Sequence, residues 1–197
     1  MASRRLPSRK RSDITDQKEK AAFETLEKEA STTFGAPGQS PFIYKDSRGA
    51  LVGPFPFFLA APEAGTHLLG LFRKLGAIPG LPAEAREVII LAVGAHYQAP
   101  YELYAHEAVA KEKVKMEAEV VSAISKGEKP GALSEECGLA YDAAKWLLER
   151  PGKLSDELWD RCVGTFGREG TVALAHYVGA YAYTCIVLNA MDAPVPE

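Results

Sequence analysis

Apolar residues along most of this chain recur at the spacing of one helix face, and no stretch shows a convincing strand pattern. Residues 13–33 are rich in Glu, Lys and Ala and place Phe23, Leu26 and Ala30 at helical spacing. This pattern predicts a surface helix whose apolar side faces the body of the protein. Residues 35–56 contain too many Gly and Pro for regular structure, so they predict a loop that wraps the core.

Proline and glycine mark the helix boundaries in the middle of the chain. The segment PEAGTHLLGLFRKLG begins with proline and ends with glycine, as helices commonly do. The segment LPAEAREVIILAVGAHYQ places Pro82 early and continues with an apolar stripe. Pro100 ends that helix and can open the next one, because proline is tolerated in a first helical turn.

The last third of the chain predicts further helices. Ser134 and Ser155 each precede a run of acidic and apolar residues, as N-cap residues do. Residues 171–191 are about long enough to span a membrane, but His176, Asn189 and several Tyr and Thr make them only moderately apolar. We expect them to form a central helix that is buried on all sides. The whole pattern predicts an all-α, single-domain bundle of about eight helices.

Composition limits the classes of partner. The chain has 197 residues, of which 47% are hydrophobic and 25% charged, with a formal net charge of -3. These values are typical of a soluble globular protein with one sizeable core. A nearly balanced charge gives no electrostatic reason to expect nucleic acid or an anionic membrane as a partner.

Cysteine usage and the amino terminus bear on the compartment. Cys137, Cys162 and Cys185 are odd in number, far apart and never in a Cys-x-x-Cys pair, which argues against a disulfide framework and a zinc site. The basic amino terminus meets acidic residues by Asp13, and no apolar signal-peptide core follows it. We therefore expect a cytoplasmic protein.

Candidate chemistry gathers in residues 96–111, HYQAPYELYAHEAVAK. Tyr101 and Glu102 fall in the first turn of a new helix, and His106 lies four residues after Glu102 on the same face. Glu87 would face the same space if its helix and the next one form a hairpin. A carboxylic acid beside an imidazole suits proton transfer, although a Glu and a His at this spacing are often a solvated surface pair.

Several segments together resemble the carboxymuconolactone decarboxylase family in its single-domain form. They are GPFPFFLAAPEAG, AREVIILAVGAHYQAPYELYAHE, GREGTVALAHYVGAYAYTCIVLNAM and the closing APVP. The resemblance runs from about Leu51 to the carboxyl terminus. It implies a helical domain over residues 51–197, of the alkylhydroperoxidase D-like fold, and leaves residues 1–50 as an arm, surface helix and wrapping loop.

One motif of this family separates redox from non-redox members. In the alkylhydroperoxidase D type, a glutamate is followed at fixed spacing by two cysteines and a histidine. Counting from Glu87 reaches Ala99, Glu102 and His106 at these positions, so the spacing is kept and both cysteines are absent. A thiol peroxidase needs a thiolate and a resolving partner, so redox function is disfavoured.

The resemblance implies a lyase that uses no cofactor and no metal and acts on a small cyclic unsaturated acid or lactone. Glu102 and His106 would be the acid and its partner, and Glu87 would orient them. Further residues expected to bind substrate are Tyr101, His96, Phe55 and Phe58, the last two as an apolar wall. The family also implies a homo-oligomer. An isomerase or cyclase on the same site, or a non-catalytic oligomeric binding protein, remains an alternative.

Overall fold

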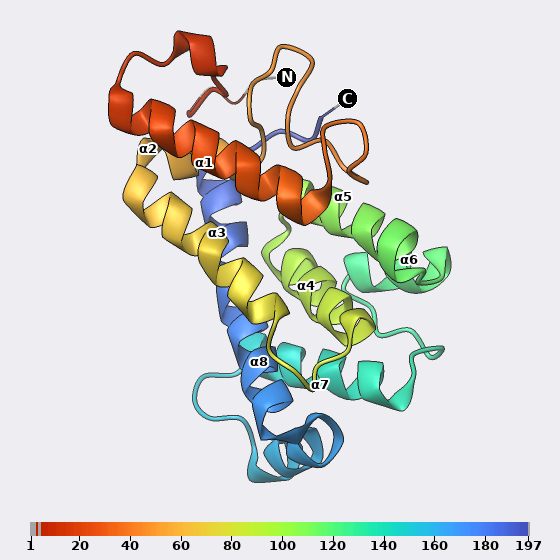
Figure 1. Cartoon of the computed structure of the whole chain (residues 1–197). Helices are drawn as coiled ribbons and strands as arrows, with labels where there is room; N and C mark the ends of the chain where they lie inside the picture. Colours follow the sequence, from red (N-terminus) through yellow and green to blue (C-terminus); the bar gives the residue numbers. More distant parts are fainter. Residues whose placement is uncertain (1–2, 4, 197) are drawn as a thin grey trace.

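The computed structural model describes residue 3 and residues 5–196, and its regular structure there is entirely helical (Figure 1). Strand-like pairing in this part of the chain is limited to two isolated bridges that involve the loop before Phe55. The predicted all-α fold class is confirmed. The eight α-helices are α1 (Gln17–Phe34), α2 (Phe55–Ala60), α3 (Pro62–Gly76), α4 (Ala83–Tyr97), α5 (Pro100–Val109), α6 (Ala118–Ser125), α7 (Glu135–Glu149) and α8 (Asp156–Met191).

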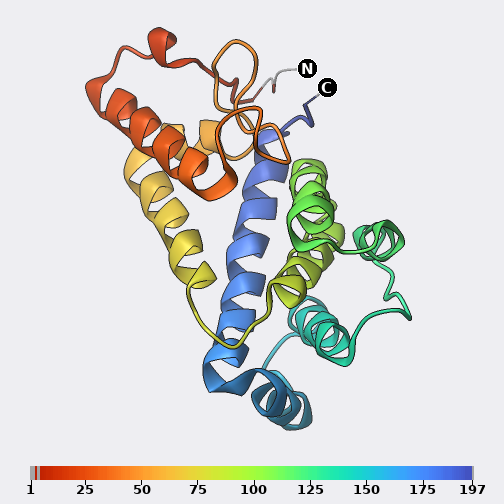
Figure 2. The ribbon, with the colours of Figure 1, turned by 45° about the vertical axis from the view of Figure 1, so that its right-hand side comes forward.

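Helix α4 is the centre of the bundle. Its side chains from Ala85 to Gly94 are buried with the exception of Arg86, which is partly buried, and α4 contacts α5, α6, α7 and α8. A helix that is apolar on nearly all sides is typical of a core position. Figure 2 shows α8 (blue) running the length of the molecule between α3 (yellow) and the α4–α5 pair (green).

Helix α8 differs from the prediction for residues 171–191. It begins at Asp156 and is interrupted by non-helical backbone at Gly167, where φ is 70° and ψ is 174°. One face of the helix stays exposed, with Val172, Tyr183 and Ile186 as its large apolar residues. The expectation of a helix buried on all sides was therefore wrong, because the contacts of α8 with α3, α4, α5 and α7 leave this face uncovered.

By length and composition alone, the same helix could span a membrane. In the described part of the chain, α8 alone is long and apolar enough, and half of its most apolar window is buried inside the protein. Burial of this kind is what the core helix of a soluble domain also shows.

The amino-terminal segment contributes to a second hydrophobic cluster. Phe23, Leu26 and Ala30 of α1 are buried there, as their spacing predicts. They lie with residues of the loop, α2, α3 and α5, and α1 packs directly on α3. Figure 1 shows α1 (red-orange) lying across one end of the bundle. The space beneath it holds the candidate site.

Candidate active site

A tight hairpin between α4 and α5 sets the geometry of the candidate site. Gln98 adopts the left-handed conformation at the end of α4, and the Ala99 N–H donates to the Gly94 carbonyl at 3.0 Å. Pro100 then opens α5. Gly94 lets the two helices approach, because a Cβ there would lie 2.9 Å from the Leu103 side chain. The hairpin places Glu87 of α4 beside His106 of α5.

Three ionisable side chains form one continuous chain. His106 Nδ1 lies 2.9 Å from Glu87 Oε2, and His106 Nε2 lies 3.3 Å from Glu102 Oε1. The side chains are 14%, 10% and 6% exposed for His106, Glu87 and Glu102, respectively. Both ring nitrogens of His106 are therefore engaged by carboxylates in a nearly dry environment. The structure brings together the three residues that the sequence selected as candidates for acid–base chemistry.

Burial and charge oppose each other at His106. Burial favours the neutral imidazole, but the charge of Glu87, its hydrogen bond and the charge of Glu102 together raise the His106 pKa to about 8. The ring is therefore mostly a cation at neutral pH. Burial also raises the pKa of Glu102; the charge of His106 opposes this shift and that of Glu87 adds to it. Glu102 therefore keeps a proton more readily than an exposed glutamate does.

The three residues line the inner end of a cavity of about 460 Å³. Phe55 and Phe58 of α2 form part of its wall, as expected for an apolar lining. Tyr181 of α8 closes another side, with its ring centroid 5.1 Å from that of His106 at an interplanar angle of 89°. The cavity wall thus carries several aromatic rings, and its buried charged groups are Glu87, His106 and Glu102.

Tyr101 contributes an aromatic ring to the cavity wall, and its hydroxyl bonds the wrapping loop. Its ring lines the cavity, but its hydroxyl donates to the carbonyl of Ile43 at 2.7 Å, and the N–H of Ile43 donates to the Tyr104 hydroxyl at 3.1 Å. The loop is pressed against this ring: Gly53 has a φ of 70°, and a Cβ there would lie 2.3 Å from Tyr101. The two tyrosines of α5 therefore anchor the wrapping loop.

His96 is not brought to the cavity. It is exposed near the end of α4, its ring packs edge-on against Tyr97 at 5.0 Å between centroids, and it does not line the cavity. Its assignment as a substrate-binding residue is corrected. The reason is helical phase: nine residues separate His96 from Glu87, which is two and a half turns and places the two on opposite faces.

Other lining residues were not predicted from the sequence. They include Phe34 of α1, Phe42 of the wrapping loop, Phe72 and Arg73 of α3, and Tyr181 of α8. The aromatic residues could be recognised only as hydrophobic, which is equally consistent with a core position. Arg73 could not be recognised as a lining residue, since a basic residue in the last turn of a helix is common for structural reasons.

The cysteines lie apart from this chemistry. Cys137, Cys162 and Cys185 are buried and free, and none lines the cavity. Burial is the main cause of a raised pKa for each thiol. They are therefore poor nucleophiles near neutral pH. Within residues 3 and 5–196, no group of three His, Cys, Asp or Glu side chains is arranged to hold a metal ion.

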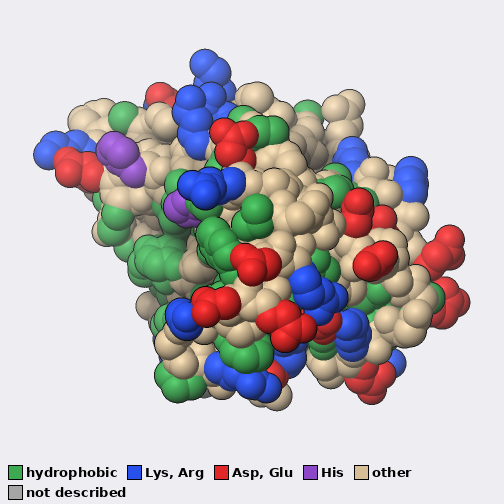
Figure 3. Space-filling model, turned by 90° about the horizontal axis from the view of Figure 1, so that it is seen from below, with side chains coloured by type: hydrophobic (Ala, Val, Ile, Leu, Met, Phe, Trp, Pro, Cys, Tyr) green, Lys and Arg blue, Asp and Glu red, His purple; other side chains and the backbone are tan. Residues whose placement is uncertain are grey.

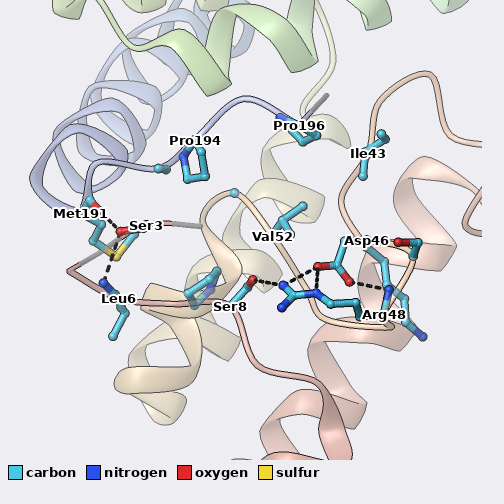
Figure 4. Close-up of a pocket in the computed structure, with 15 residues that line it drawn as sticks. Ser3, Leu6, Ser8, Ile43, Asp46, Arg48, Val52, Met191, Pro194 and Pro196 are labelled. Atoms are coloured by element: carbon cyan, nitrogen blue, oxygen red, sulfur yellow. Dashed lines mark hydrogen bonds and ion pairs between the residues drawn. The ribbon is translucent and has the colours of Figure 1, made fainter. Parts of the chain in front are cut away.

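A second hollow, of about 380 Å³, lies between the two ends of the chain and the wrapping loop (Figure 4). Ser3 bonds the carbonyl of Met191 there, and Arg48 bonds both Asp46 and Ser8. These contacts tie the two ends of the chain to each other and the amino-terminal segment to the loop. The hollow contains no histidine among its lining residues and no paired acids, so it is a weaker candidate for proton transfer.

The structure thus defines an all-α protein with a buried acid–base chain between its central hairpin and its longest helix. No family model and no curated protein matches the sequence. The fold is shared with the debrominase Bmp8. The apo structure of Bmp8 matches with a TM-score of 0.69 at 15% identity, covering 92% of this chain and 90% of that one.

A second Bmp8 structure, a cysteine-to-alanine variant in complex with 2,3,4-tribromopyrrole, also matches with a TM-score of 0.69. Its identity is 17%, and the match covers 97% of this chain and 91% of that one. Identity at this level establishes a common fold and says nothing by itself about the reaction.

Proposed function

We propose that this chain is an acid–base enzyme that uses no cofactor and acts on a small cyclic unsaturated acid or lactone, in the manner of a carboxymuconolactone decarboxylase. The observation that carries the proposal is the chain of Glu87, His106 and Glu102 at the inner end of the cavity. A buried chain of this kind can hold a proton away from water and deliver it to a bound compound.

Each residue has a defined part in the proposed reaction. The bond from the ring to its carboxylate breaks, carbon dioxide leaves, and the electron pair stays on the ring as an extended enolate. Glu102, which lines the cavity and has a raised pKa, donates a proton to the ring carbon. His106 returns a proton to Glu102. Glu87 stabilises the His106 cation through the 2.9 Å hydrogen bond and fixes the orientation of the imidazole.

Thiol chemistry is the less favoured alternative. The two positions that hold cysteine in the redox relatives are Ala99 and Glu102 in this chain, and neither can form a thiolate. The cysteines that are present are buried away from the cavity. The shared fold with Bmp8 supports a small-molecule enzyme in general, and the tribromopyrrole complex makes a small ring a reasonable ligand shape.

An isomerase or cyclase is the nearest alternative on the same site, because a proton delivered to one carbon and removed from another needs the same three residues. A non-catalytic binding protein would bind a compound in the cavity without any proton transfer by Glu87, His106 and Glu102. The three functions predict different products, so they can be separated by one assay.

The experiment is to incubate the protein in deuterium oxide with a panel of unsaturated lactone acids. Decarboxylation would release carbon dioxide and place one deuterium in the product. Isomerisation would incorporate deuterium without release of carbon dioxide. Neither event, with the protein still thermally stabilised by a panel member, would favour the binding protein.

Two variants connect the reaction to the site. Glu102→Gln and His106→Gln should each lower turnover by about a hundredfold or more, as expected for acid–base groups. Glu107→Gln is the matched control, since Glu107 lies on the same helix but pairs with Lys111 at 3.0 Å. Full activity of either site variant would refute the assigned roles.

We also propose that the protein is a homo-oligomer. The exposed face of α8 carries Val172, Tyr183 and Ile186, and Leu71 of α3 is exposed as well. Figure 3 shows hydrophobic side chains (green) gathered on one side of the molecule seen from below, while charged groups are scattered over the rest of this face. Light scattering at micromolar concentration tests this, and a monomer would refute it.

A further inference from the structure

The proposed reaction creates a negative charge on oxygen that the acid–base chain does not stabilise. When carbon dioxide leaves, the electron pair spreads through the conjugated ring to the oxygen of its carbonyl group. Glu102 delivers its proton to carbon, and both ring nitrogens of His106 are already engaged, by Glu87 at 2.9 Å and by Glu102 at 3.3 Å. The oxygen therefore needs a separate hydrogen-bond donor, because an unpaired charge is costly in a poorly solvated cavity.

Most hydroxyl groups in the buried wall of the cavity already have partners. The Tyr101 hydroxyl donates to a carbonyl of the wrapping loop at 2.7 Å, and the Thr184 hydroxyl donates to the backbone of its own helix at 3.0 Å. The guanidinium of Arg86 lies 5.9 Å from the centre of the Tyr177 ring and bonds its hydroxyl. These three hydroxyls hold the fold together.

The hydroxyl of Tyr181 differs from them. Tyr181 lines the cavity, and its hydroxyl makes no hydrogen bond with any residue in the described part of the chain. The fully buried side-chain oxygens that lack a partner there belong to Glu19 and Ser125. The Tyr181 oxygen is therefore accessible, and a compound in the cavity can bond to it.

The surroundings of Tyr181 fix its ring and keep its proton in place. The ring packs edge-on against His106 with 5.1 Å between centroids, and it stacks on Tyr177 at 5.9 Å with an interplanar angle of 6°. Burial, followed by the charges of Glu102 and Glu87, raises the pKa of Tyr181 well above its usual value. The hydroxyl therefore stays neutral and can donate a hydrogen bond beside the acid–base chain.

We propose that Tyr181 is the oxyanion donor of this site: its hydroxyl donates a hydrogen bond to the carbonyl oxygen of the bound ring while Glu102 faces the reacting carbon. The inference rests on the proposed function for the identity of the reaction. The bond to the carboxylate breaks, carbon dioxide leaves, and the electron pair moves to the carbonyl oxygen, where the Tyr181 hydrogen bond becomes stronger. Glu102 then protonates carbon, the carbonyl group re-forms, and Tyr181 keeps its own proton.

This role narrows the substrate class. The ring must carry a carbonyl group that is conjugated with the reacting carbon, because only then does the charge reach an oxygen. An unsaturated lactone acid meets this condition. A ring acid that has no carbonyl group besides its carboxylate does not meet it, and we expect no turnover of such a compound.

Two five-membered lactones test the inference by ligand NMR titration, without any need for turnover. Tetronic acid is an enolate at neutral pH, whereas 2(5H)-furanone is a neutral lactone with the same ring. Tyr181→Phe should weaken tetronate by about tenfold or more and the furanone by at most about threefold, since a hydrogen bond to a charged oxygen is the stronger one. Equal weakening of both compounds would overturn the inference, as would unchanged tetronate affinity or a wild-type protein that does not bind tetronate.

Tyr183→Phe is the matched control, because Tyr183 lies on the same helix, is 40% exposed and does not line the cavity. It should leave the binding of both lactones unchanged. Thermal unfolding tests whether the hydroxyl of Tyr181 has a structural role. Because this hydroxyl has no partner among the residues that the structure describes, Tyr181→Phe should unfold at the wild-type temperature. A lower unfolding temperature would overturn the inference.

Turnover separates failure of the inference from failure of the proposed function. Tyr181→Phe should lower kcat about a hundredfold and leave KM within about threefold, as expected for a donor that acts mainly in the transition state. Loss of tetronate binding in this variant, combined with no turnover of any lactone acid, would leave the oxyanion donor standing and refute the enzyme. Carbon dioxide release that depends on Glu102 but not on Tyr181 would refute the inference and leave the proposed function standing.

Discussion

Replacement of Glu87 by glutamine should lower the pKa of His106 and thereby report directly on the acid–base chain. Glutamine keeps an oxygen that can accept the hydrogen bond from His106 Nδ1 at the present 2.9 Å, but it removes the negative charge. Burial, the largest influence on His106, favours the neutral ring. In the variant the charge of Glu102, the smallest of the raising influences, and a hydrogen bond to an uncharged oxygen would oppose it.

The size of the shift follows from these influences. The His106 pKa of about 8 should fall to 6.5 or below, since burial outweighs what remains. A fall of 1.5 units corresponds to about 2 kcal/mol of lost preference for the cation. At about pH 7.5 the protonated fraction would drop from roughly three-quarters to roughly one-tenth. The variant would lose most of the cation that is proposed to supply Glu102 with protons.

Imidazole nitrogen shifts measured by NMR as a function of pH are the assay, and they need no substrate. The protein has four histidines, and the signal that disappears in His106→Gln identifies the relevant one. Glu107→Gln removes a charge one residue away, from a side chain paired with Lys111, and should shift His106 by a few tenths of a unit at most. A wild-type pKa near or below 6.5, or no change in Glu87→Gln, would refute the reasoning.

Three further predictions concern stability and reactivity. Tyr101→Phe removes the 2.7 Å hydrogen bond to Ile43 and leaves that carbonyl unpaired, so urea unfolding should show a loss of about 1 to 2 kcal/mol; an unchanged midpoint would contradict it. Leu91→Ala in the fully buried centre of α4 should cost about 2 to 5 kcal/mol by the same measurement. A thiol reagent should leave the three cysteines of the native protein unlabelled for minutes and label all of them in urea, and rapid native labelling would show that they are accessible.

The helices could be predicted because their signals are local. The segment from Pro62 to Gly76 is a helix with the bounds that its terminal proline and glycine indicate. Ser134 and Ser155 cap α7 and α8 through side-chain oxygens that accept from the N–H groups three residues later. The three acid–base residues could also be predicted from the sequence, since helical spacing fixes which face a side chain occupies.

The rest depended on how helices are placed and rotated relative to one another, which spacing within one segment does not report. The apolar run of residues 171–191 resembles a fully buried helix, but only its neighbours determine that one face stays exposed. Phe34 and Phe42 meet because the wrapping loop returns beneath α1. Phe34 of α1 and Arg73 of α3 line the same cavity because α1 packs on α3, and no pattern in either segment indicates this contact.

On the proposed function, the position of Glu102 accounts for how one fold could carry two kinds of chemistry. The first turn of a helix beside a histidine cation would lower the pKa of a cysteine and favour a thiolate. A carboxyl group at the same place differs, because its pKa in water is already low. Burial is the largest influence on Glu102, and it raises the pKa of Glu102 although the charge of His106 lowers it. A thiol there would become a nucleophile, whereas a carboxyl becomes a proton donor. On the proposed function, Glu102 in place of one cysteine and Ala99 in place of the other would separate acid–base from redox chemistry within a shared arrangement of helices.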